Sequence, residues 1–86
     1  MLPKIDFLIA RVLVKRQRFS EALAMFEQMP ADASREQGLA LAYYGLGKVS
    51  AADAALARLI ELAELPNANR QVKIYVAEVH AFRGNA

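Results

Sequence analysis

His80 is the only histidine in this 86-residue sequence, and so the only side chain whose ordinary pKa lies near neutral pH. The nearest carboxylate along the chain, Glu78, is two residues away, which on a helix places the two side chains on different sides. Metal ligands that share a helix face need a spacing of three or four residues. There is no cysteine, so neither a disulfide nor a thiolate metal site can form. We therefore interpret His80 as an ordinary packing or surface residue.

Glycines and serines offer no better catalytic motif. Gly45 and Gly47 are two residues apart, but the residues that follow them do not continue a phosphate-binding loop. Ser20, Ser34 and Ser50 each stand where a helix is expected to begin, which is the position of an N-cap. The sequence thus predicts a protein that is not an enzyme and that holds no metal and no cofactor.

Positive charge near the start is the remaining chemical feature. Residues 1–18 carry five basic residues and one acid, whereas residues 19–66 carry seven acids and three basic residues, although the whole chain has a net charge of only +2. Four of the basic residues have helical spacings and would line one side of the first helix: Lys4, Arg11, Lys15 and Arg18. This stripe is either a solvated face or a site for an acidic peptide or protein surface. Nucleic acid is disfavoured, because no aromatic residues alternate with the basic ones.

Composition and periodicity predict an all-α domain. Hydrophobic residues make up 56% of the chain, and many are alanine, the strongest helix former. Nothing alternates with the period of two that marks a half-buried strand. Apolar residues three and four apart, punctuated by Pro30, Gly47 and Pro66, predict five helices over about residues 4–16, 20–29, 32–46, 50–64 and 69–83. For the third helix, Asp32 and Ser34 are both candidate caps, and for the fifth, Asn67 and Asn69.

Apolar runs in this stretch are short. None reaches the roughly 20 residues that a membrane-spanning helix needs, and the run near the start is too short for a signal peptide. We therefore expect no membrane insertion and a cytoplasmic location.

The sequence repeats itself at a shift of thirty residues, with small residues matching small ones and large apolar residues matching large apolar ones. The matched pairs are Ile9 with Leu39, Ala10 with Ala40, Leu13 with Tyr43, Phe19 with Val49, Ala22 with Ala52, Phe26 with Leu56 and Met29 with Leu59. Such a period is typical of solenoids, in which each unit buries its apolar face against its neighbours. Small residues would let the helix backbones approach closely. We expect this packing role for Ala10, Ala22, Ala40, Ala52 and Ala77.

The order of residue types within each unit resembles the tetratricopeptide repeat (TPR). The likeness rests on Leu39, Ala40, Tyr43, Gly47, Ala52, Leu56 and Leu59, on Ile9, Ala10, Leu13, Ala22, Phe26 and Met29, and on Val76, Ala77, His80 and Gly84. Gln17 takes the place of the usual glycine, and the spacing is shorter than the family's roughly 34 residues. The resemblance implies a right-handed superhelix of antiparallel helix pairs. It also implies a single TPR-like domain over residues 1–86, with units of about 3–32 and 33–66 and a terminal helix of about 69–83.

In TPR proteins a peptide or protein partner usually lies in the concave groove formed by the first helix of each unit. Carried over position by position, the resemblance places ten residues in this groove: Phe7, Arg11, Val14, Lys15, Gln37, Leu41, Tyr44, Ile74, Glu78 and Phe82. The lysine–asparagine clamp by which some members hold a C-terminal carboxylate is not present, because the matching positions hold Phe7, Arg11 and Gly38. The resemblance therefore implies an adaptor or scaffold for a protein or peptide, and the basic stripe favours an acidic one.

The ends of the chain leave a second interpretation open. Two units and one helix fall short of the about three units that a solenoid usually needs. The last helix also carries apolar residues that something should cover: Val72, Tyr75, Val76, Val79 and Phe82. Either the chain is a fragment whose next repeats cover them, or two copies pack as a homo-oligomer. In this alternative the chain is a structural or oligomerisation unit that uses its apolar end helices. The tract from Tyr43 to Gly84 is also similar to repeats of larger bacterial regulatory proteins, of which the chain would be a part.

Overall fold

The computed structural model describes residues 4–29 and 32–84, and this part of the chain consists of five α-helices and no strand. The helices are α1 (Lys4–Lys15), α2 (Phe19–Glu27), α3 (Ala33–Gly45), α4 (Val49–Ala63) and α5 (Arg70–Gly84). The predicted all-α class and the predicted number of helices are therefore confirmed. None of these described helices is both long enough and apolar enough to cross a bilayer.

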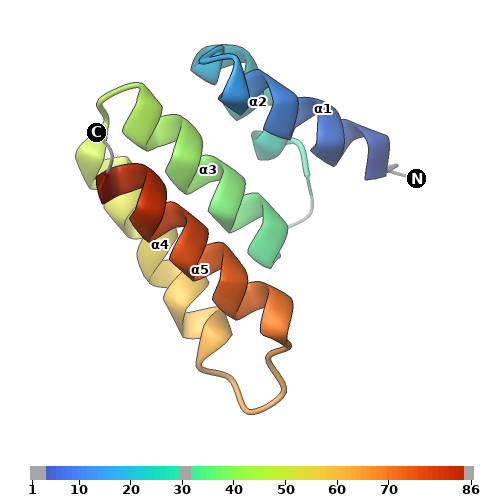
Figure 1. Cartoon of the computed structure of the whole chain (residues 1–86), viewed down its shortest axis with the longest axis vertical. Coiled ribbons are helices and arrows are strands. Elements are labelled where there is room, and N and C mark those ends of the chain that lie inside the picture. Colours follow the sequence, from blue (N-terminus) through green and yellow to red (C-terminus); the bar gives the residue numbers. More distant parts are fainter. Residues whose placement is uncertain (1–3, 30–31, 85–86) are drawn as a thin grey trace.

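Helix α3 lies at the centre of the molecule. Each helix packs against the next one along the chain, and α3 also contacts α1 and α5, so it contacts all four other helices. Figure 1 shows α3 between the α1–α2 pair and the α4–α5 pair. Every residue of α3 from Glu36 to Ala42 is buried as a result. A helix surrounded in this way must be apolar or small on all sides, which explains its run of leucine, alanine and glycine.

The two tight turns within the helix pairs have the same geometry thirty residues apart. Gln17 and Gly47 both adopt the left-handed conformation, with φ of 62° and 79°. The amide of the next residue then donates to a carbonyl five positions back, at 2.8 Å from Arg18 to Leu13 and at 2.9 Å from Lys48 to Tyr43. These bonds satisfy carbonyls that the helix end leaves unpaired. Gln17 therefore occupies a backbone position that favours glycine.

We expect Gln17→Gly to raise the free energy of unfolding by about 0.5–1 kcal/mol. The left-handed conformation costs a residue with a side chain about 1–2 kcal/mol, and the greater freedom of glycine in the unfolded chain offsets part of the gain. The measurement is urea unfolding followed by circular dichroism. The matched control is Gly47→Gln, which should lower stability because a residue with a side chain is strained in the left-handed conformation. Nothing lies within 4 Å of the added Cβ, so this backbone strain is the only cost. Equal stability of Gln17→Gly and the parent chain would mean that Gln17 is not strained in the left-handed conformation.

The serine caps predicted for three helices are wrong. Ser20 and Ser50 are each the second residue of their helix, and neither α2 nor α4 has a side-chain hydrogen bond at its N-cap. The preceding turn is so tight that each helix starts two residues earlier than a serine cap would allow. Ser34 lies inside α3, and its hydroxyl is 3.3 Å from the hydroxyl of Tyr75 on α5. It therefore joins two helices.

Two helices begin with a polar side chain that was among the predicted alternatives. The Asp32 carboxylate accepts a hydrogen bond from the Arg35 amide at 3.0 Å at the start of α3. The Asn69 side chain accepts one from the Val72 amide at 3.1 Å at the start of α5. Both satisfy an amide that has no partner within its own helix.

Two glycines let α2 pack closely against α3. Phe19 and Phe26 are two helical turns apart on one side of α2, and Gly38 and Gly45 have the same spacing on α3. A Cβ atom on either glycine would overlap the ring of a phenylalanine, Phe26 at Gly38 and Phe19 at Gly45. Phe26 is completely buried. The two helices thus approach as closely as they do because α3 carries no side chain at these two points.

Four of the five alanines expected between helices have that place. Ala10, Ala22, Ala40 and Ala52 are fully buried. Ala77 is exposed, and its predicted packing role is wrong, because no described helix covers that side of α5.

Most of the apolar residues of the last helix that were expected to need a cover are packed inside the described part of the chain, although Ile74 of α5 is 40% exposed. Tyr75 and Val79 of α5 are buried, and the partly buried Val72, Val76 and Phe82 pack against the same core. Helices α3 and α4 thus cover most of this apolar face. On α1, by contrast, three large apolar residues are exposed to 58%, 45% and 48%: Leu8, Ile9 and Val12.

Candidate functional site

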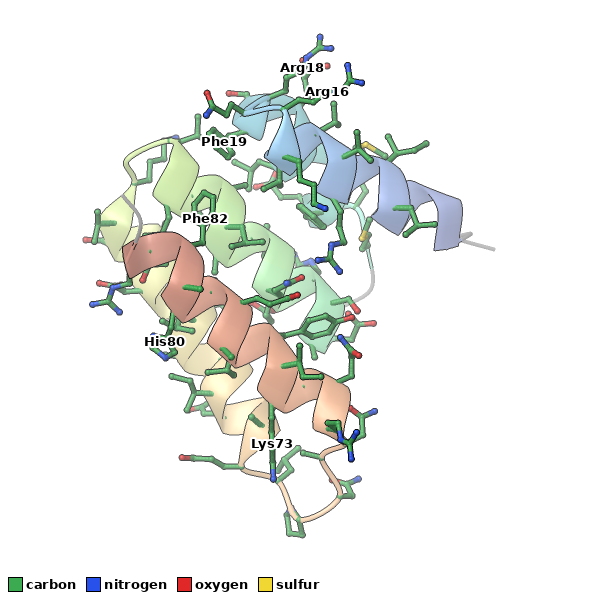
Figure 2. All side chains as sticks on the ribbon, in the orientation of Figure 1. Arg16, Arg18, Phe19, Lys73, His80 and Phe82 are labelled. Carbon is green, nitrogen blue, oxygen red and sulfur yellow. The ribbon has the colours of Figure 1, made fainter. Side chains whose placement is uncertain are left out.

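A groove of about 680 Å³ opens between α1 and α5, with α3 as its floor. Within the described residues the backbones of α1 and α5 do not contact each other, so the two helices form separate walls. Side chains from the start of α2 close one end of the groove. Figure 2 shows two of its aromatic residues, Phe19 and Phe82, together over the last turns of α3.

The structure brings eight of the ten predicted groove residues into this one hollow. They are Arg11, Val14 and Lys15 on α1, Gln37, Leu41 and Tyr44 on α3, and Glu78 and Phe82 on α5. Ile74 is exposed one turn before Glu78 and does not line the groove. The side chain of Phe7 lies outside the part of the chain that the structure describes.

The sequence missed several lining residues, and these come mainly from the first turn and from α2. They are Gln17, Phe19, Phe26, Gly45 and Ala81. The resemblance pointed only to first helices, so the phenylalanines of α2 were placed in the core alone. Phe19 reaches the groove because Gly45 leaves room for its ring. A glycine matched in spacing to a phenylalanine of the preceding helix is the signal that could have identified it.

One end of the groove is polar and centres on Glu78. Its carboxylate lies 3.6 Å from the Arg11 guanidinium and accepts a hydrogen bond from Gln37 Nε2 at 2.5 Å. The three side chains come from three different helices, so this contact spans the groove. Gln37 is completely buried, and its Oε1 atom has no hydrogen-bond donor among the described residues. An unsatisfied buried acceptor costs about 1–3 kcal/mol, so the polar floor does not exist for stability alone.

The other end of the groove is apolar and aromatic. The rings of Phe19 and Phe82 meet edge to face, with centroids 6.2 Å apart and an interplanar angle of 76°. This is a favourable geometry for aromatic pairs. Both rings are only partly buried. Leu41 and Val14 extend the same surface along the floor and the α1 wall. This end can therefore take up an apolar side chain.

Tyr44 connects the groove to α4. Its hydroxyl donates a hydrogen bond to Asp53, and the Arg83 guanidinium lies 5.9 Å from the centre of its ring. Burial, together with the hydrogen bond to Asp53, raises the pKa of Tyr44 above its ordinary value. The phenol is therefore neutral throughout the physiological range and serves as a hydrogen-bond donor.

Of the residues predicted for the basic stripe, the structure places Arg11 and Lys15 in the groove and separates Arg18 from them. Helix α1 ends at Lys15, and the left-handed conformation of Gln17 turns the chain away, so Arg18 lies at the start of α2. There it pairs with Glu21 at 2.7 Å in an exposed contact, and Figure 2 shows Arg16 and Arg18 pointing away from the groove. The side chain of Lys4 is outside the described part. Arg11 and Lys15 are thus the basic residues that the structure places in the groove.

A second hollow of about 370 Å³ lies between the start of α3 and the end of α4. Its main feature is Glu36, which is buried and pairs with Arg58 at 2.9 Å and with Arg35 at 3.5 Å. Because its carboxylate is already occupied by two guanidinium groups, this hollow is best explained as an ion-pair network that joins the two helices.

Catalytic groups are not concentrated in either hollow. His80 is exposed on α5 and lines neither of them (Figure 2). In residues 4–29 and 32–84 there is no group of three or more histidine, aspartate or glutamate side chains that could hold a metal ion. The groove can bind an apolar group at one end and a charged group at the other.

No family model matches this chain, and no curated protein or solved structure matches it either. The groove must therefore be interpreted from its own residues.

Proposed function

We propose that this chain is a protein–protein interaction module, not an enzyme, that binds a peptide or protein partner in the groove between α1, α3 and α5. The observation that carries the proposal is the pairing of an aromatic end, formed by Phe19 and Phe82, with a basic residue, Lys15, in one open hollow. Apolar anchors surrounded by a few polar groups are what protein-binding surfaces use for affinity and orientation.

The order of the helices supports a TPR-like arrangement for this module. The second helix of each pair packs against the first helix that follows it, as α2 does against α3 and α4 against α5. The turns at Gln17 and Gly47 repeat the same hydrogen bonds at the same thirty-residue interval as the sequence. In such an arrangement the successive first helices form one continuous surface, and here they form the groove.

The charges of the groove favour an acidic partner. Lys15 is exposed on the α1 wall and makes no ion pair with any described residue, and Arg11 lies one helical turn before it. Opposite charge on a partner would steer it to this wall and fix its orientation. A segment with a large apolar side chain next to a carboxylate would match both ends of the groove.

The charge reversal Lys15→Glu tests this proposal. We expect it to weaken partner binding about three- to tenfold and to flatten the salt dependence, because it replaces an attraction with a repulsion at an exposed site. The partner is first captured with the unchanged chain from the source cells, and its affinity is then measured by fluorescence anisotropy at several salt concentrations. Reversal of Arg11 as well should weaken binding further.

The matched control is Arg16→Glu. It makes the same charge change one residue further along, but Arg16 points away from the groove (Figure 2). If both reversals changed affinity equally, only the net charge of the protein would matter. If neither changed it, the partner would bind elsewhere.

A homo-oligomer is the second candidate, and the exposed apolar residues of α1 favour it. Leu8, Ile9 and Val12 lie on one side of the helix, and a second copy could bury them. This surface belongs to one of the two end helices that the sequence suggested for self-association. Light scattering separates the two candidates, because a clean monomer at high micromolar concentration would count against self-association.

A further inference from the structure

Glu78 is an acidic residue placed in a groove whose other two charged side chains, Arg11 and Lys15, are basic. Its carboxylate reaches from α5 across to Arg11 on α1 and to Gln37 on α3. The contact has two unequal halves. The Arg11–Glu78 pair is partly solvated, since the exposed fractions of the two side chains are 32% and 39%, and such pairs contribute little to stability. The other half, Gln37, is fully buried and cannot move without disturbing α3.

One receiving group, Gln37, is therefore fixed, while the carboxylate that it holds is exchangeable. Gln37 presents its amide Nε2 from a helix that is packed on all sides, and Arg11 and Lys15 stand one turn apart on the facing wall. Glu78 can turn out toward solvent at small cost, because its side chain is already partly exposed. Withdrawal of this carboxylate would leave a buried amide donor in an open groove, with Arg11 and Lys15 on the facing wall. That set of groups binds a carboxylate.

We infer that Glu78 is an internal competitor, and that an aspartate or glutamate side chain of the partner displaces it from Gln37 and Arg11. The inference rests on the proposed function and specifies the partner: a peptide segment with a carboxylate next to a large apolar residue, the latter lying against Phe19 and Phe82. Glu78 sets the threshold for entry, because it halves the positive charge of the groove until a ligand replaces it. It is a specificity-determining residue and touches the partner's site directly.

The polar and the aromatic end of the groove bind different parts of the ligand, and both parts matter. The polar and aromatic ends belong to one hollow and share the α3 floor from Gln37 to Gly45. A carboxylate alone exchanges one ion pair for another and gains little. An apolar side chain alone leaves Glu78 in place. Only a ligand with both groups removes apolar surface from water and also displaces Glu78 while the buried Gln37 donor stays satisfied.

The test uses two labelled nine-residue peptides in titrations of the isotopically labelled full chain followed by NMR. One peptide carries two glutamates beside a phenylalanine, and the other carries glutamines in their place. We expect the acidic peptide to shift the amide signals of Gln37, Leu41 and Phe82, and Glu78→Gln to bind it about fivefold more tightly than the parent chain. Glutamine keeps an acceptor for Gln37 and removes only the charge. The matched control is Glu64→Gln, an exposed residue at the end of α4, which should change nothing.

A second measurement needs no substitution. In the parent chain, the side-chain carboxyl carbon signal of Glu78 should move as the acidic peptide saturates the groove, since this carboxylate loses both of its partners. If the groove amides shift while that signal stays in place, or if Glu78→Gln binds the acidic peptide no better than the parent, the internal competitor is overturned and the binding module stands. If neither peptide shifts the groove amides of any variant, the inference and the proposed function both fail.

Discussion

Gly38→Val should lower the free energy of unfolding by about 3 kcal/mol or more. The Cβ alone would overlap the ring of Phe26, which is completely buried. Overpacking a core costs about 1–3 kcal/mol, and the second and third carbons of valine add to the overlap. A domain of this size has only about 4–13 kcal/mol of stability, so the effect is a large fraction of the total. Urea unfolding followed by circular dichroism measures it.

Two further variants show whether the loss comes from this one contact. Gly45→Val makes the same change at the other glycine, but its neighbour Phe19 is only partly buried and its ring can move, so the loss should be smaller. Phe26→Leu removes the ring that the valine of Gly38→Val would overlap. The double variant should therefore lose less stability than the sum of the losses of the two single variants. Additive losses would mean that the two residues do not oppose each other.

Val79→Asp should have an effect of similar size, about 3–5 kcal/mol, at the other side of the molecule. Val79 is completely buried in the core beneath α5. An aspartate there would bury a carboxylate with no partner or force α5 away from α3 and α4. The expected result is an unfolding midpoint at much lower urea concentration, or loss of cooperative unfolding.

The adjacent residue provides the control for this prediction. His80→Asp introduces the same side chain on the same helix at an exposed position and should change stability by less than about 0.5 kcal/mol. Comparable losses from the two substitutions would mean that α5 does not pack on this face, and that its apolar residues await a partner, as the sequence first suggested.

The helices and turns could be predicted because their signals are local. Apolar periodicity set the positions of all five helices, and Gly47 marked its turn by residue type. The start of a helix depends on more than its first polar residue. Ser20 and Ser50 looked like caps, but the preceding turn closes through hydrogen bonds that place the start of each helix two residues earlier.

Contacts between distant segments could be predicted only where the repeat supplied them. The register of the repeat placed Lys15, Tyr44 and Glu78 on successive first helices, and the structure brings them to one hollow. The fit of Phe26 over Gly38 joins two different helix pairs through a side chain and its absence, and periodicity alone does not reveal which pairs face each other. The partial coverage of α5 was missed for the same reason.

The central place of α3 restricts how this protein could change its binding preference over evolution. The floor of the groove and the middle of the core are the same helix, so a new side chain at Gln37 or Leu41 would alter recognition and stability together. Substitutions on the walls would alter recognition with little effect on stability, because Lys15 on α1 and Ala81 on α5 line the groove from exposed positions. Descendants that acquire new partners should therefore diverge along the rims of the groove while its base stays the same.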